Sequence, residues 1–123
     1  MKKLSLFFLG MGLLYAGPCG ARFGSGNAER FFKERGYHEC RYVKIVNMDL
    51  HNGVIDVKVK NRSHSSKDGY VLAGYIDSAS GRIGWACGYS GFDLDGREKD
   101  YIRVRLEAEP IFSRTYDAKV YCK

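Results

Sequence analysis

Four cysteines are the side chains of this 123-residue sequence whose number and spacing point most directly to chemistry. An even set in an oxidising compartment indicates two disulfide bonds, with three possible pairings. No CxxC pair occurs, so the signature of a thioredoxin-like redox site or a zinc ribbon is missing. We expect one bridge to join Cys40 to Cys122 and to tie the first strand to the last. The other disulfide candidates are Cys87 and Cys19.

Three histidines, His38, His51 and His64, are the next candidates for chemistry. They lack the compact HxxxH spacing that would identify a metal site, although His38 lies near Cys40. We therefore predict exposed loop histidines and neither a metal nor a cofactor.

Acid–base catalysis could still occur in a small cationic hydrolase such as a ribonuclease. That reaction would use a glutamate base and a histidine acid, with arginines holding the phosphate. The candidates are Glu107 or Glu109 with Arg103 and Arg105. Three of these residues alternate along one predicted strand, as the solvated face of any sheet would. No G-x-S-x-G motif supports an esterase.

Aromatic residues beside small residues provide a candidate binding surface in the stretch 89–93, which we expect to form a loop. Tyr89 and Phe92 are the candidate binding residues, because such rings bury a large area at low entropic cost. The alternative is that both rings cap one end of the fold.

The first 21 residues are typical of a secretory signal peptide. Lys2 and Lys3 precede an apolar run over residues 4–14, which is shorter than the ~20 residues that a membrane-spanning helix needs. Cleavage after Ala16 keeps all four cysteines, whereas cleavage after Ala21 removes Cys19. Lipidation at Cys19 is a less favoured alternative. We expect an exported protein, periplasmic or extracellular, with no membrane span once the leader is removed.

The net charge is +6, with 20 Lys and Arg against 14 Asp and Glu. Removal of Lys2 and Lys3 with the leader would reduce it to +4. The bases alternate with acids, as in Asp56, Lys58 and Lys60, which is typical of a solvated sheet face. We therefore predict no nucleic-acid partner.

Residues 22–41 predict a lead-in and one short helix. Asn27 is a plausible N-cap, the helix covers residues 28–35, and Gly36 ends it. We expect Phe31, Phe32 or both to pack against an open end of the sheet.

Residues 42–123 predict a β domain, because the apolar pattern changes there to a period of two. Asn52-Gly53 indicates a type I′ hairpin. One face of the strand over residues 82–89 carries only small residues, which suggests close approach by a neighbouring layer. The predicted strands cover residues 42–48, 54–60, 70–76, 82–89, 101–106 and 116–122. Six or seven such strands describe an antiparallel sandwich or small barrel.

The order of elements over residues 54–106 resembles the FxLYD-type domain of bacterial envelope proteins, which is immunoglobulin-like. The resemblance lies in an Asn-x-Ser strand end, an aromatic-x-Asp turn with glycine, and a Leu-x-Gly-x-Glu turn. The residues that carry it are Asn61, Ser63, Tyr75, Asp77, Gly81, Leu94, Gly96 and Glu98. It implies a mainly β, antiparallel immunoglobulin-like sandwich of six or seven strands with one short N-terminal helix.

These features together predict an exported, non-enzymatic protein-binding or accessory domain of the cell envelope, whose partner is another envelope or extracellular protein. The first alternative is a secreted enzyme inhibitor or effector. The second is the cationic hydrolase described above.

Overall fold

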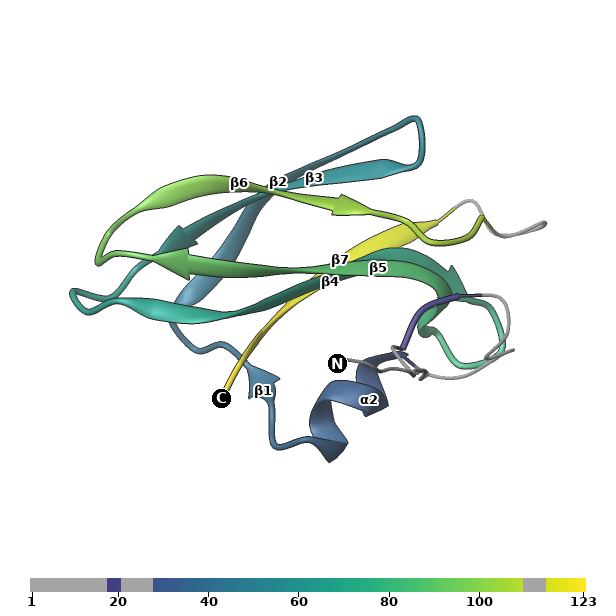
Figure 1. The fold of residues 1–123 in the computed structure, drawn as a ribbon, viewed down its shortest axis with the longest axis horizontal. Coiled ribbons are helices and arrows are strands. Elements are labelled where there is room, and N and C mark those ends of the chain that lie inside the picture. The colour runs from purple at the N-terminus through teal and green to yellow at the C-terminus, as the bar shows by residue number, and fades with distance from the viewer. Residues whose placement is uncertain (1–17, 21–27, 110–114) are drawn as a thin grey trace, which may run out of the picture.

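The computed structural model describes residues 18–20, 28–109 and 115–123 (Figure 1). The protein is mainly β, with two antiparallel sheets and one short helix in the described residues. The elements are α2 (Ala28–Glu34), β1 (His38–Glu39), β2 (Val43–His51), β3 (Val54–Asn61), β4 (Lys67–Asp77), β5 (Arg82–Leu94), β6 (Lys99–Arg105) and β7 (Tyr116–Cys122).

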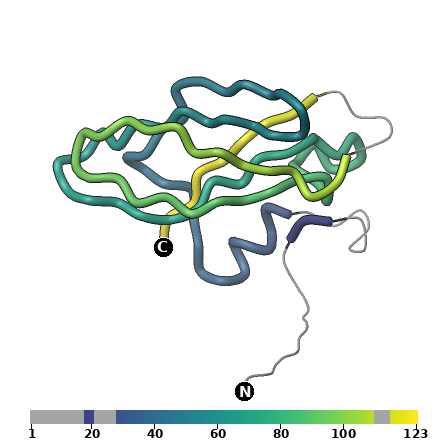
Figure 2. The backbone as a smooth tube through the Cα atoms, turned by 45° about the horizontal axis from the view of Figure 1, so that its top comes forward, coloured from purple at the N-terminus to yellow at the C-terminus, as the bar shows by residue number. Residues whose placement is uncertain are grey.

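The strands form two layers. One sheet has four strands in the order β1-β7-β4-β5, and the other has three in the order β2-β3-β6. Every neighbouring pair is antiparallel. The three-stranded sheet is the upper layer in Figure 1, and the turned view in Figure 2 shows the same separation.

Alternation of apolar residues places the main core between the layers. Ile55, Val57 and Val59 of β3 are fully buried and pack with Val71 and Val104. The predicted strands are confirmed with longer bounds. β2 continues to His51, β4 begins at Lys67, and β5 extends to Leu94. The stretch 89–93 therefore lies within β5 and not in a loop, because it pairs with β4 up to Leu94.

The hairpin between β2 and β3 forms as predicted. Asn52 has φ 50° and Gly53 has φ 73°. Positive φ at both central residues is the requirement of a type I′ turn, whose twist matches that of the flanking strands.

Helix α2 ends as its sequence indicates but packs elsewhere than expected. Gly36 has φ 88°, and the N–H of Tyr37 donates to the carbonyl of Phe32 at 3.0 Å, as in a Schellman cap. Phe32 packs on Leu72 and Tyr121, so the helix covers the outer face of the four-stranded sheet and not an open end (Figure 1). The outer face of that sheet is consequently buried at Leu72, Ile83 and Tyr121. Asn27 lies outside the described residues.

The expected close approach on the small-residue face of β5 occurs at Gly88. A Cβ there would overlap the carbonyl oxygen of Arg105, so only glycine lets β6 cross at this distance. The N–H of Glu107 then donates to the carbonyl of Cys87 at 2.9 Å. Backbone contacts thus join the two layers along the β5–β6 side.

Two disulfides complete the core. The expected bridge between Cys40 and Cys122 is confirmed, and Cys19 pairs with Cys87. The second bridge attaches residues 18–20 to β5, where the N–H of Gly20 also donates to the carbonyl of Trp85 at 2.8 Å.

Candidate functional site

The two predicted binding residues lie on opposite faces of β5. The Tyr89 side chain is on the outer face and is 37% exposed, whereas Phe92 is 6% exposed and belongs to the core between the sheets. The Tyr89 ring contacts Phe32 and Tyr70 edge-on, at centroid distances of 5.8 and 6.0 Å. Tyr89 is therefore the member of the pair that a partner could reach readily.

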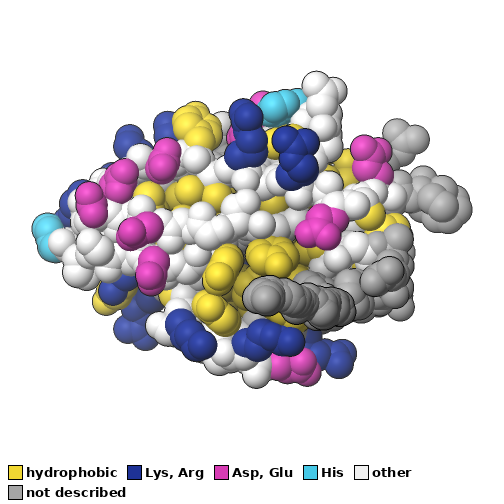
Figure 3. Space-filling view, viewed as in Figure 1, with side chains coloured by type: hydrophobic (Ala, Val, Ile, Leu, Met, Phe, Trp, Pro, Cys, Tyr) yellow, Lys and Arg dark blue, Asp and Glu magenta, His cyan; other side chains and the backbone are white. Residues whose placement is uncertain are grey.

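An aromatic cluster surrounds Tyr89 on this outer face. Phe32 of α2 is its centre, stacked on Tyr121 at 5.1 Å and in edge contact with Tyr37 at 5.7 Å. Tyr37 is held in place by the cap of α2, and its ring meets Tyr70 at 5.7 Å, also edge-on. Figure 3 shows hydrophobic side chains gathered in the lower middle of this face, with several acidic side chains at its left and others at its right.

A cavity of about 570 Å³ opens beside these tyrosines, and we call it the tyrosine cavity. Tyr70 pairs with Gly91 across β4 and β5, so its ring lies over a residue that has no side chain. Two register steps further along the same face, Asp68 lies directly opposite Asp93. The cavity is lined by Tyr37, Asp68, Gly69, Tyr70, Gly91, Phe92, Asp93 and Lys123.

The charges of this cavity favour a cation. Asp68 and Asp93 are both exposed and form no ion pair with another described residue. The ammonium of Lys123 lies 5.1 Å from the Tyr37 ring centroid, within cation–π range. One tyrosine face of the cavity thus already holds a cation from this chain, while the two carboxylates face solvent without a partner.

The electrostatics of Tyr89 keep its hydroxyl protonated. Burial raises the pKa of this phenol above its usual value, and the nearby Glu107 carboxylate and Tyr70 raise it further. The Tyr89 hydroxyl consequently remains a hydrogen-bond donor to a higher pH than an ordinary tyrosine does.

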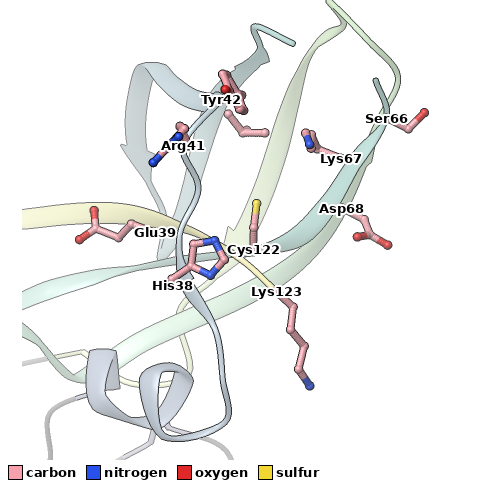
Figure 4. Close-up of a pocket in the computed structure, with 10 residues that line it drawn as sticks. His38, Glu39, Arg41, Tyr42, Ser66, Lys67, Asp68, Cys122 and Lys123 are labelled. Carbon is pink, nitrogen blue, oxygen red and sulfur yellow. The ribbon is translucent and has the colours of Figure 1, made fainter. Parts of the chain in front are cut away.

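A second cavity of about 590 Å³ adjoins the first and shares Asp68 and Lys123 with it (Figure 4). It lies beside the Cys40–Cys122 bridge, between the β1–β2 connection and the start of β4. Its charges are mixed, and Lys67 lies 5.7 Å from the Tyr42 ring centroid. The residues lining it are His38, Glu39, Arg41, Tyr42, Val43, Ser66, Lys67, Asp68, Cys122 and Lys123.

The candidate hydrolytic residues are only partly brought together. Arg103 Nε donates to Asp56 Oδ1 at 3.1 Å, and His51 Nε2 lies 2.9 Å from Asp56 Oδ2. The sequence analysis did not identify Asp56 as the partner of Arg103 and His51. Its alternation with Lys58 does place it on the same solvated sheet face as Arg103. Glu107 and Glu109 are exposed, and neither side chain hydrogen-bonds a histidine within the described ranges.

The described part of the chain contains no group of three His, Cys, Asp or Glu side chains that could hold a metal ion. All three histidines are exposed, as predicted, but only His64 lies in a loop, because His38 belongs to β1 and His51 ends β2. None of the helices described here is long and apolar enough to span a membrane.

Comparisons with models of protein families, with curated proteins and with solved structures gave no match for this chain.

Proposed function

We propose that this protein is an exported, non-enzymatic binding module whose tyrosine cavity receives a lysine or arginine side chain of an envelope or extracellular protein. The observation that carries the proposal is the pair Asp68 and Asp93, directly opposed beside Tyr37 and Tyr70. Like charges facing each other across two strands destabilise a sheet. A bound cation would remove that repulsion.

The chemistry of the lining suits this ligand. Tyrosine faces attract ammonium and guanidinium groups, and carboxylates form charge-assisted hydrogen bonds with them. Tyr89 extends the aromatic surface beyond the cavity and would contact apolar parts of the same partner. Lys123 neutralises part of the site in the free protein, and a partner cation would displace its ammonium from the Tyr37 ring.

Export is supported by the two disulfides, because such bonds persist mainly in oxidising compartments. We further propose cleavage of the leader after Ala16. Cleavage after Ala21 would delete Cys19, which is 3% exposed and bonded to Cys87. Mass spectrometry of the exported chain should find residue 17 at its start and two intact bridges. A chain starting at residue 22 would contradict this.

An immunoglobulin-like sandwich, as implied by the FxLYD-type resemblance, fits the strand order. β2, β3 and β6 would correspond to strands A, B and E of that fold, and β7, β4 and β5 to strands F, C and C′. The two-residue β1 beside β7 would occupy the place of strand G. Domains of this architecture present binding surfaces at their ends and on exposed sheet faces.

The function is tested by capturing partners from the envelope and extracellular fractions with immobilised exported protein. The test variant combines Asp68→Asn with Asp93→Asn. The control combines Glu34→Gln with Asp49→Asn, two exposed carboxylates outside the cavity. We expect the test variant to remain folded and to lose at least about tenfold of the captured partner, since two charge-assisted contacts are each worth roughly 1.5 kcal/mol. Equal capture by both variants would refute the proposal.

A further inference from the structure

Lysines form a row across all three strands of the β2-β3-β6 sheet. Lys44 lies directly opposite Lys60, and Lys60 lies directly opposite Lys99. Residues opposite each other in a ladder point to the same face, so three ammonium groups are aligned on the outer side of this layer over about 10 Å. None of the three forms an ion pair with another described residue. We call this set the lysine row.

The net charge of the protein is concentrated on the same face. The alternation of side chains along β2, β3 and β6 places six Lys and Arg residues on this outer face. Two carboxylates, Asp49 and Asp56, lie on the same face, so its net charge is +4. The whole chain has an excess of six, of which Lys2 and Lys3 belong to the predicted leader. The rest of the mature surface is therefore neutral in total. The six cations are Lys44, Lys58, Lys60, Lys99, Arg103 and Arg105.

The two carboxylates do not neutralise the lysine row. Asp56 is bonded to Arg103 and His51 at the opposite end of the face. Asp49 lies opposite Asp56 at that same end. The next step on the same face as the row contains Asn47, Lys58 and Tyr101 and no acid; Asp100, next to Lys99 in sequence, alternates to the other face. Because like charges in register reduce sheet stability, this arrangement is unfavourable unless an anionic surface lies against it.

We propose that this face docks on an anionic lipid surface, with the lysine row on the headgroup phosphates. Tyr101 is 57% exposed beside Lys58, whose ammonium lies 5.4 Å from the ring centroid. An amphipathic ring next to a lysine stem is suited to the boundary between headgroups and acyl chains.

The shape and composition of the face favour lipid over nucleic acid. The row consists of lysines, which act as point charges and need no fixed bidentate geometry. Mobile headgroups can adjust to such a planar array. Binding of single-stranded nucleic acid would call for several stacking rings, and Tyr101 is the one aromatic side chain that alternation places on this face of the described strands.

The test measures partition of the exported protein onto vesicles containing about one third phosphatidylglycerol in phosphatidylcholine. The row variant carries Lys44→Gln, Lys60→Gln and Lys99→Gln. The control carries Arg30→Gln, Lys33→Gln and Lys119→Gln, which remove the same charge from elsewhere. Each lysine near an anionic surface contributes about a fivefold change, so the row variant should bind about a hundredfold more weakly. The control should lose much less.

The row variant should also melt at the same temperature as the wild type or higher, because repulsion is relieved. Equal losses in both variants would show that only net charge matters and would overturn the proposal. So would absence of binding to the anionic vesicles, or tighter row-dependent binding of a DNA oligonucleotide or polyglutamate. The Asp68→Asn, Asp93→Asn variant should bind vesicles normally, which keeps this test separate from that of the tyrosine cavity.

Discussion

Asp68 and Asp93 lie directly opposite each other across β4 and β5, and both are exposed. A second opposed pair, Asp49 and Asp56, differs because Asp56 is hydrogen-bonded to Arg103 and contacts His51. Repulsion in the second pair is thus offset within the fold. At the tyrosine cavity neither carboxylate forms an ion pair with a described residue, although Lys123 lies nearby, and a bound cation would offset the remaining repulsion.

Replacement of one cavity carboxylate should stabilise the free protein. Asp93→Asn removes the like-charge pair and should raise the free energy of unfolding by about 0.5 kcal/mol. Glu34→Gln, a charge change on the exposed side of α2, should have almost no effect. The comparison is made by urea unfolding at low ionic strength. A loss of stability on Asp93→Asn would mean that this carboxylate has a structural partner.

Substitutions of Tyr89 and Phe92 should have different effects, because Tyr89 is a candidate contact residue and Phe92 is a core residue. Tyr89→Ser should weaken partner capture and lower the melting temperature less than Phe92→Ser does, since the side chain is 37% exposed and loses two edge contacts with neighbouring rings. Phe92→Ser should cost about 3–5 kcal/mol of stability, because it opens a cavity between the sheets. Capture and thermal melting are measured on the same samples. Similar destabilisation by both changes would assign Tyr89 to the core as well.

The Tyr121 hydroxyl is buried and has no hydrogen-bond partner among the described residues. Burial raises the pKa of this phenol, and the carboxylates of Glu29 and Glu39 raise it further. The folded protein therefore keeps a proton that the unfolded chain loses near pH 10, and stability falls as the pH rises above that value. Tyr121→Phe should reduce this dependence, to which Tyr89 also contributes, and should stabilise the protein by about 1 kcal/mol at neutral pH.

Unfolding of the wild type and Tyr121→Phe is compared from neutral pH to about pH 11. A Tyr121→Phe variant that is less stable at neutral pH would show that the hydroxyl makes a favourable interaction.

Asp56 should make the stability of the upper sheet depend on pH in the acid range. Hydrogen bonds from His51 and Arg103 lower the pKa of its carboxyl below the usual 3.8. Its contribution is therefore present above pH 3.8 and is lost as the pH falls through the lower folded value. Asp56→Asn should be less stable than the wild type at pH 6, and the two should converge toward pH 2. A constant difference across that range in thermal melting would contradict this account.

The sequence predicts the β class and the β2–β3 hairpin, because alternation and Asn-Gly are local signals. It predicts the Cys40–Cys122 bridge because these cysteines lie beside the first and last predicted strands. The pairing at the tyrosine cavity is not local. A regular β4–β5 hairpin that starts from the Asp77–Arg82 pair would place Asp68 opposite Gly91. The register shifts between Gly74 and Ile76, and Asp68 is therefore opposite Asp93.

The aromatic cluster could not be predicted from the sequence either. Adjacent Phe31 and Phe32 indicate that α2 packs on something but do not say which face it covers. Tyr37 and Tyr70 come from separate segments and meet only after α2 docks on the outer face of the four-stranded sheet. Tyr89 was identified because aromatic residues beside glycine and serine stand out locally.

The most direct test of the binding proposal is an NMR titration of the isotope-labelled protein, with both disulfides formed, with Nα-acetyl-arginine amide. Its uncharged citrulline analogue serves as the control. The account predicts saturable shifts at Tyr37, Tyr70 and Gly91 with the arginine probe, far weaker shifts with citrulline, and loss of the response in the Asp68→Asn, Asp93→Asn variant. Equal responses to both probes, or shifts centred outside the tyrosine cavity, would contradict it.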